Sequence, residues 1–262
     1  MKKSALFLFS LLSLSLNNVN YHLIASIPID ASVMTIDQFS NCYLISENQL
    51  IEYDSLGKMA ANFSDKNLGT LSNIDAFNPL KLQLFYPDNG MIVTLDNKLA
   101  IVAKIKLHEL DIQQPILICS SYNDAVWVYD QQDFKLKKIE STLQVSQISG
   151  NISQTIGYDI KPIFMVENNH WIYMNNPESG ILVFDIYGSY YKTIPITGIS
   201  FFQVMENQLL YFKDNVFRSY DFHTLEDKVI NLPTLSKTMI YPRIEKNKFY
   251  TLERGLIEIF SY

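Results

Sequence analysis

The residues of this chain that could carry chemistry are acidic side chains that recur at two positions of a repeating pattern. At the first position an aspartate follows an apolar or aromatic residue, in Tyr53-Asp54, Leu95-Asp96, Phe184-Asp185 and Tyr220-Asp221. Four acids at one repeat position could be four copies of a ligand site. However, Gly57 and Gly188 stand three residues after Asp54 and Asp185, as in a tight turn whose carboxylate accepts backbone N–H groups. We therefore interpret these aspartates as turn residues.

The second set of acids stands near the ends of the predicted innermost strands. Its members are Asp37, Asp75, Glu167, Glu206 and Glu245, and the third unit has Ser120 and Ser121 at that place. If the side chains point inward, they form an acidic ring that suits a hard cation such as calcium. The alternative is that they accept hydrogen bonds from the following turn, since asparagine often follows, as in ENN, ENQ and EKN. A register error of one residue would turn each acid away, so both interpretations stay open.

The elements that would position these acids are strands in a repeat. Short apolar runs end in an acid and turn-type residues, and a second extended run follows, for example in "SGILVFDIYGSYYKTIPI" (179–196). Taking Glu140 as the acid of the third unit places the anchors at 54, 96, 140, 185, 221 and 261, about 40 residues apart. A period near ~40 residues is typical of four-stranded propeller blades. The sequence therefore predicts six blades.

The two ends of the chain predict how the ring closes. The sixth unit has three strands, within 238–262, and the strand "HLIASIPI" (22–29) belongs to no unit. If this strand completes the last blade, no blade edge at that junction is left unpaired. We predict an all-β fold, a closed six-bladed β-propeller of four-stranded antiparallel blades, formed by residues 21–262 as a single domain. Deleting residues 22–29 should then lower stability out of proportion to their number.

Two long connections between blades are candidate binding loops. They are "SDKNLGTLSNIDAFNP" (64–79) and "SGNISQTIGYDIKP" (149–162). We expect them on the face of the ring that carries the connections between units and those from the second to the third strand of each unit. Long loops on a rigid scaffold often carry binding residues. Tyr158 in the second loop therefore joins Asp37, Asp75, Glu167, Glu206 and Glu245 as a candidate ligand-binding residue.

The N-terminus and the net charge limit location and partners. Residues 1–20 contain Lys2 and Lys3 and then "SALFLFSLLSLSL", a basic region and a short apolar run typical of a signal peptide. We expect export to the periplasm or medium and no membrane span after cleavage; an uncleaved N-terminal anchor is the alternative. Without Lys2 and Lys3 the chain has 19 basic and 27 acidic residues, a net charge of −8. Such a domain is unsuited to nucleic acid.

The remaining polar residues show no pattern of a known catalytic centre. The chain contains no G-x-S-x-G, H-E-x-x-H, C-x-x-C or glycine-rich phosphate loop. Cys42 and Cys119 fall in blades that are not neighbours, which predicts two free, mostly buried thiols. Lys135, Lys137 and Lys138 alternate along one strand, and we interpret them as a solvated face. We predict no catalytic residues.

Three stretches resemble a known family. "NNPESGILVFDIYGSYYKTIPI", "NIDAFNPLKLQLFY" and "SYNDAVWVYD" resemble a family of exported six-bladed propellers of the Bacteroidota, over residues 22–262. The strand pattern is also similar to TolB-like and NHL-type propellers. The resemblance implies an exported propeller and carries over no catalytic residue.

Together these observations predict a binding or scaffold module of the cell envelope. The expected partner is an envelope protein or a small ligand, with no cofactor, and the expected state is a monomer. The alternative is a calcium-dependent hydrolase or lactonase with its site in the central channel. Fold alone does not decide between them.

Overall fold

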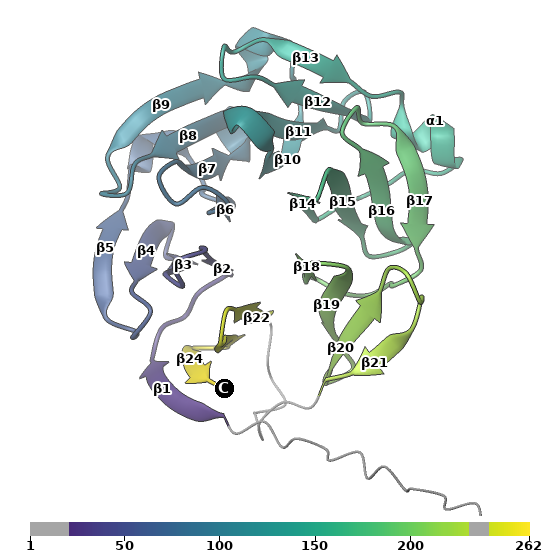
Figure 1. Ribbon diagram of the computed structural model, residues 1–262. Helices are drawn as coiled ribbons and strands as arrows, with labels where there is room; N and C mark the ends of the chain where they lie inside the picture. Colours follow the sequence, from purple (N-terminus) through teal and green to yellow (C-terminus); the bar gives the residue numbers. More distant parts are fainter. Residues whose placement is uncertain (1–20, 231–240) are drawn as a thin grey trace, which may run out of the picture.

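The chain forms a ring of six antiparallel sheets, each of four strands (Figure 1). The computed structural model describes residues 21–230 and 241–262. In every sheet the hydrogen-bonded order runs from an inner strand a to an outer strand d. The prediction of an all-β, six-bladed propeller is confirmed. The predicted signal peptide, residues 1–20, lies outside the described residues.

The strands follow one another from the channel outward in each blade. Blade 1 contains β2 (Val33–Ile36), β3 (Cys42–Ser46), β4 (Gln49–Tyr53) and β5 (Met59–Phe63). Blade 2 contains β6 (Asn73–Asp75), β7 (Leu82–Tyr86), β8 (Met91–Leu95) and β9 (Ile101–Lys106). Blade 3 contains β10 (Pro115–Ser120), β11 (Val126–Asp130), β12 (Lys135–Ile139) and β13 (Val145–Ile148).

The same order continues through the second half of the ring. Blade 4 contains β14 (Phe164–Asn168), β15 (Trp171–Asn176), β16 (Gly180–Asp185) and β17 (Tyr190–Ile194). Blade 5 contains β18 (Phe202–Met205), β19 (Gln208–Lys213), β20 (Val216–Asp221) and β21 (Asp227–Val229). Blade 6 contains β22 (Tyr241–Glu245), β23 (Lys248–Glu253), β24 (Leu256–Ser261) and the N-terminal strand β1 (His22–Ile27).

Short helical turns occur in the connections. The long loop between blades 3 and 4 contains α1 (Ile152–Ile156), whose first turn is capped by the Asn151 side chain accepting from the Gln154 N–H. The 3-10 turns are η1 (Lys66–Leu68), η2 (Pro87–Asn89), η3 (Leu107–Leu110) and η4 (Tyr122–Asp124).

Strand β1 closes the ring as the outer strand of blade 6. It pairs antiparallel with β24, from His22 opposite Ser261 to Ile27 opposite Ile257. Ile27 is buried in the same apolar cluster as Ile257 and Ile259. The antiparallel ladder satisfies backbone groups that would otherwise form a free edge on β24. The predicted exchange of the N-terminal strand is confirmed.

The turns between the third and fourth strands share one hydrogen-bond pattern. The backbone N–H of each anchor donates to a carbonyl four or five residues later, at Asp54, Asp96, Glu140, Asp185 and Asp221. One carboxylate oxygen of each of the four aspartates also accepts two backbone N–H groups at 2.8–2.9 Å. The interpretation of these acids as turn residues is confirmed, and Glu140 does occupy the aspartate position.

The apolar core lies between neighbouring blades, because both faces of each sheet are packed. Trp127, Tyr129 and Leu136 of blade 3 form one buried cluster with Met174 and Phe184 of blade 4. The strands of the blade interior therefore show long buried runs instead of a clean alternation. Cys42 and Cys119 are free and buried, as predicted.

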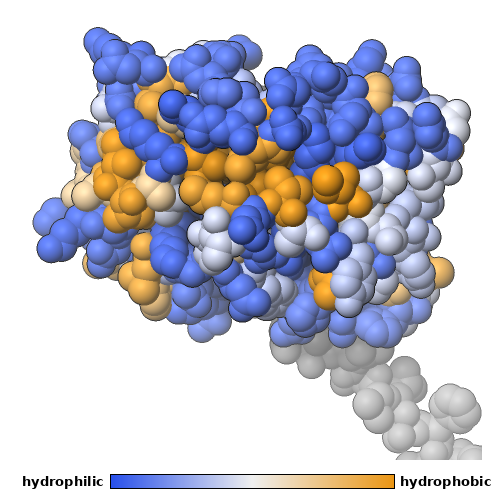
Figure 2. Space-filling model, turned by 90° about the horizontal axis from the view of Figure 1, so that it is seen from above, coloured by the Kyte–Doolittle hydropathy of each residue, from blue (hydrophilic) through white to orange (hydrophobic). Residues whose placement is uncertain are grey.

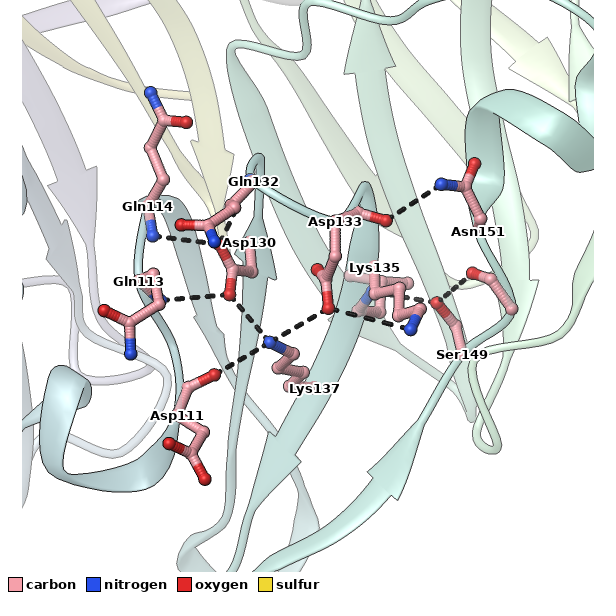
Figure 3. A network of polar contacts seen from close by, with 12 residues as sticks. Asp111, Gln113, Gln114, Asp130, Gln132, Asp133, Lys135, Lys137, Ser149 and Asn151 are labelled. Atoms are coloured by element: carbon pink, nitrogen blue, oxygen red, sulfur yellow. Dashed lines mark hydrogen bonds and ion pairs between the residues drawn. The ribbon is translucent and has the colours of Figure 1, made fainter.

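The prediction of a solvated lysine face in blade 3 is wrong for Lys137. Its side chain is 7% exposed, and its Nζ donates to Asp130 Oδ2 at 2.7 Å and to the Asp111 carbonyl at 3.0 Å (Figure 3). The buried Asp130 carboxylate also accepts from the Gln113 and Gln114 N–H groups. Alternation does not identify a solvent face here, since a second blade covers each side of a sheet.

In the part of the chain that is described, no helix is long and apolar enough to cross a membrane.

Candidate functional site

The centre of the ring contains a cavity of about 720 Å³. It is lined by the innermost strands of all six blades, β2, β6, β10, β14, β18 and β22, which surround the centre of Figure 1. A cavity of this size is typical of sites that bind a small molecule. Loop 64–79 contributes residues from Ser72 onward, whereas the lining includes no residue of loop 149–162.

The innermost strands all run in the same direction through the ring, because every blade has four antiparallel strands and an a-strand first. Residues at the start of these strands therefore lie at one mouth of the channel, and residues at their ends lie at the other. The starts carry the aromatic residues Phe164, Phe201 and Tyr241. The ends carry the carboxylates Asp75, Glu167 and Glu245. The channel thus gathers three aromatic residues at one mouth, and three carboxylates together with Phe77 at the other.

Two predicted acids of the ring join neighbouring blades. Asp75 accepts from the Ser120 N–H of blade 3 at 2.6 Å and from the Phe77 N–H of its own turn at 2.9 Å. Glu167 of blade 4 is 5% exposed and accepts from Trp127 Nε1 of blade 3 at 2.8 Å. Both line the cavity, so each has a structural contact and a position where a ligand could reach it.

Two other predicted residues lie in turns at the ends of strands. Asp37 is buried, and its carboxylate accepts from the Phe39 and Asn41 N–H groups and from the Tyr43 hydroxyl. Glu206 is exposed in the turn after β18, with φ +50°. Neither residue belongs to the cavity lining. Their role as ligands stays a prediction.

The last two predicted residues differ in position. Glu245, at the end of β22, is half-buried in the cavity wall, and burial raises the pKa of its carboxyl while Arg243 acts in the opposite direction. Tyr158 is 42% exposed in the loop that contains α1 and is not part of the cavity lining. The structure therefore brings Asp75, Glu167 and Glu245 together at the channel and leaves Asp37, Glu206 and Tyr158 outside it.

Arg243, which was not among the predicted site residues, is the one basic residue in the described part of the cavity lining. It stands two residues before Glu245 on β22, so both side chains leave the strand on the same side. Its guanidinium lies over the Phe201 ring, with Cζ 5.2 Å from the ring centroid. Burial lowers the pKa of Arg243 to about 10, and the charges of Glu245 and Asp75 act in the opposite direction. Alternation of Arg243 with Glu245 in a predicted inner strand could have revealed it.

The guanidinium of Arg243 has unused hydrogen-bond donors. Its Nε is buried without a hydrogen-bond partner. The two terminal amino groups are not among the buried unsatisfied atoms, and no hydrogen bond or ion pair joins them to a described residue. They therefore face the open space of the channel. A guanidinium with free, planar donors is suited to bind a carboxylate or phosphate with two parallel hydrogen bonds.

An aromatic cluster surrounds this cation. The Phe164 and Phe201 ring centroids are 4.8 Å apart, and those of Phe201 and Tyr241 are 5.1 Å apart. The three residues come from blades 4, 5 and 6 and line the cavity. Such rings offer apolar surface and can also hold a cation by its attraction to their faces.

The geometry does not support a calcium site at the acids. Among residues 21–230 and 241–262, no three His, Cys, Asp or Glu side chains lie close enough together to hold a metal ion. The carboxylates of Asp37, Asp75 and Glu167 instead accept protein hydrogen bonds. The interpretation that such acids bind turn amides fits Asp37 and one oxygen of Asp75.

A second cavity, of about 470 Å³, lies between blades 2 and 3. Its lining combines Phe77 and Tyr122 with residues of β9, among them the exposed Val102. Figure 2 shows an apolar patch on the side of the ring that carries β9 and β13. Lys81 and Asp124, which form an ion pair, also line this second cavity.

Comparison with known proteins supports the fold and no family. No family model matches the chain, and no curated protein matches its sequence. The Pan2 WD40 domain of Neurospora crassa has a TM-score of 0.68 at 9% identity, with 92% of this chain and 95% of that chain covered. Virginiamycin B lyase from Staphylococcus aureus has a TM-score of 0.60 at 10% identity, with 87% and 79% covered.

A bacterial extracellular domain is also similar in structure. The extracellular domain of the BT4673 one-component system from B. thetaiotaomicron has a TM-score of 0.57 at 11% identity. The match covers 87% of this chain and 33% of that chain. At these identities the likeness shows the propeller fold alone.

Proposed function

We propose that this protein is an exported binding module of the cell envelope that holds a small ligand in its central channel. The observation that carries the proposal is Arg243, whose terminal amino groups have no partner among the described residues and face a cavity of about 720 Å³. Removing a guanidinium from bulk water without a counter-charge costs free energy. A bound anionic group would offset that cost.

Other features support a binding site in the channel. The channel wall is formed by strands of all six blades and joined by contacts between blades, such as the Gln203 side chain that exchanges hydrogen bonds of 2.6 and 2.9 Å with the Ile244 backbone. A rigid wall preorganises its polar groups, which favours affinity. Export is supported by the composition of residues 1–20, and one structural neighbour is an extracellular domain. Loss of about 20 residues, measured by intact mass of the secreted protein, tests the export.

The binding function can be tested by filling one mouth of the channel. Ser200 is exposed and lines the cavity just before β18, so Ser200→Trp places a large ring in the mouth without replacing a core residue. A library of small charged and aromatic molecules would be screened by ligand-observed NMR against the wild type, Ser200→Trp and the control Tyr158→Ala. We expect ligands that bind the wild type and the control and lose at least tenfold in affinity with Ser200→Trp.

Three outcomes would contradict the proposal. If the library gives no ligand for the wild type, the channel is not a small-molecule site. If Ser200→Trp binds the same ligands with unchanged affinity, they bind elsewhere. Loss of binding in Tyr158→Ala as well would move the site to the loop that contains α1. Circular dichroism of each variant establishes that the propeller is folded.

A further inference from the structure

The chemistry of the channel changes along one strand. Tyr241, Arg243 and Glu245 occupy alternate positions of β22, and all three line the cavity. Alternate residues of a strand leave it on the same side, about 6.7 Å apart along the chain. A ligand lying along β22 therefore meets an aromatic ring, then a cation, then a carboxylate. A matching ligand would carry an apolar or aromatic group, an anionic group and a cationic group in the same order.

Neither charged group on β22 has a hydrogen bond or ion pair to another residue within 21–230 and 241–262. Arg243 and Glu245 influence each other electrostatically, yet their charged atoms are not within the 4.0 Å of an ion pair. No hydrogen bond joins the Glu245 carboxylate to a described residue, and burial raises its pKa. A ligand with an anionic group alone would satisfy Arg243 and leave Glu245 unpaired. A ligand with a cationic group alone would do the reverse.

The other charges of the channel strengthen the acidic end. Asp75 and Glu167 line the cavity at the same end of the strands as Glu245. Asp37 lies outside the lining, but its charge raises the pKa of Glu245, as burial does to a greater extent. Lys246 acts on Glu245 in the opposite direction. This mouth thus attracts a cationic group, whereas the anionic group is held deeper, at Arg243.

We propose that the channel binds a short zwitterionic peptide with an aromatic C-terminal residue. In this proposal, which rests on the proposed function, the peptide carboxylate binds the two terminal amino groups of Arg243. The C-terminal aromatic ring packs against the cluster of Phe164, Phe201 and Tyr241, whose own ring centroids lie 4.8–5.1 Å apart. The ammonium group lies several ångströms away, toward Glu245. A cavity of about 720 Å³ has room for two or three residues.

The test uses a zwitterionic dipeptide and two capped forms of it, each of which lacks one of its two charges. Leu-Phe dipeptide carries both charges, N-acetyl-Leu-Phe lacks the ammonium, and Leu-Phe amide lacks the carboxylate. Isothermal titration calorimetry at pH 7 measures each probe against the full-length mature protein. A hydrogen-bonded charge contributes enough for a loss of about 10- to 100-fold, so we expect both capped probes to bind that much more weakly than Leu-Phe.

Two variants test which residue binds which charged group of the peptide. Arg243→Gln should weaken Leu-Phe and N-acetyl-Leu-Phe about 10- to 100-fold and leave Leu-Phe amide unchanged. Glu245→Gln should weaken Leu-Phe and its amide and leave N-acetyl-Leu-Phe unchanged. Tyr158→Ala, outside the cavity, should bind all three probes as the wild type does. The three-probe comparison on the wild type does not depend on any variant being stable.

The results separate this proposal from the broader one. Equal affinity for all three probes, or no binding of Leu-Phe at millimolar concentration, would overturn the zwitterionic peptide. An equal effect of Arg243→Gln on Leu-Phe and its amide would do the same. If library ligands still lose affinity with Ser200→Trp, the channel remains a binding site for another class of molecule. If they do not, the proposed function itself is wrong.

Discussion

Replacing Gly57 by alanine should destabilise the propeller through the closing strand. Gly57 lies in the turn between β4 and β5 with φ +80°, and a Cβ built on it would be 2.4 Å from the Ala25 Cβ of β1. Gly255 has nearly the same backbone, φ +77°, and a Cβ there would meet nothing within 4 Å. The pair therefore separates the cost of the backbone conformation from the cost of pressing blade 1 against β1.

The magnitude follows from two contributions. The left-handed backbone costs a non-glycine residue about 1–2 kcal/mol, which both variants should lose. Overpacking costs about 1–3 kcal/mol more, and Ala25 has no flexible end that could move aside. We expect Gly57→Ala to lose about 2–5 kcal/mol and Gly255→Ala about 1–2 kcal/mol. In a domain of this size that difference is a Tm gap of about 2–12 °C.

Urea and thermal unfolding followed by circular dichroism measure both variants under the same conditions. The double variant Ala25→Gly with Gly57→Ala removes the opposing Cβ and should recover most of the excess loss, apart from about 0.5–1 kcal/mol for a glycine in a strand. Equal destabilisation of the two single variants would refute the reasoning. So would a double variant whose losses simply add, because residues in contact should couple.

Four further predictions follow from the structure. Lys137→Met leaves the buried Asp130 carboxylate without its ion-pair partner and should lower the unfolding free energy by about 3–5 kcal/mol in urea titration. Burial by itself would raise the pKa of Asp130. The hydrogen bonds from Lys137 and from the backbone N–H groups of Gln114 and Gln113 outweigh that effect, so the pKa of Asp130 is lowered overall. The ionised Asp130 carboxylate therefore stabilises the folded protein above pH ~4, the pKa of an unfolded aspartate, and this stabilisation is lost as the pH falls through the pKa of Asp130 in the folded protein. Asp130→Asn should thus make the free energy of unfolding depend less on pH in the acidic range. Burial raises the pKa of both thiols, so a maleimide should label Cys42 and Cys119 only after unfolding in guanidinium; rapid labelling of the native protein would contradict their placement. Asp185→Ala should cost about 1 kcal/mol through two lost backbone hydrogen bonds, and a variant as stable as the wild type would disprove this turn role.

The architecture was predictable because it rests on local rules that the sequence states repeatedly. The aspartate turns recur with glycine at the required left-handed position, as at Gly57 and Gly188. The surplus strand at residues 22–29 and the incomplete sixth unit agree with β1 pairing with β24. Even the substitution of Glu140 for aspartate was found by spacing, and its backbone turn matches the others.

The site was only partly predictable, because its residues converge from strands that are distant in sequence. The recurrence of acids at strand ends pointed to Asp75, Glu167 and Glu245 but not to Arg243, because the other inner strands have no arginine at the matching position. Lys137 was misplaced because its strand is covered by a blade on each side. The contact between Glu167 and Trp127 joins two blades, and no spacing rule predicts such a pair.

The pairing of β1 with β24 also sets the order in which the protein can be completed. His22 is among the first described residues and Ser261 among the last, so this ladder cannot form until nearly the whole propeller sequence is available. Five blades are made of contiguous strands and can form from local contacts, whereas blade 6 requires closure of a loop that spans the domain. Until that step, β24 presents an open edge to other chains. Once β1 has paired with β24, the edge of β24 is no longer available for aggregation with other chains.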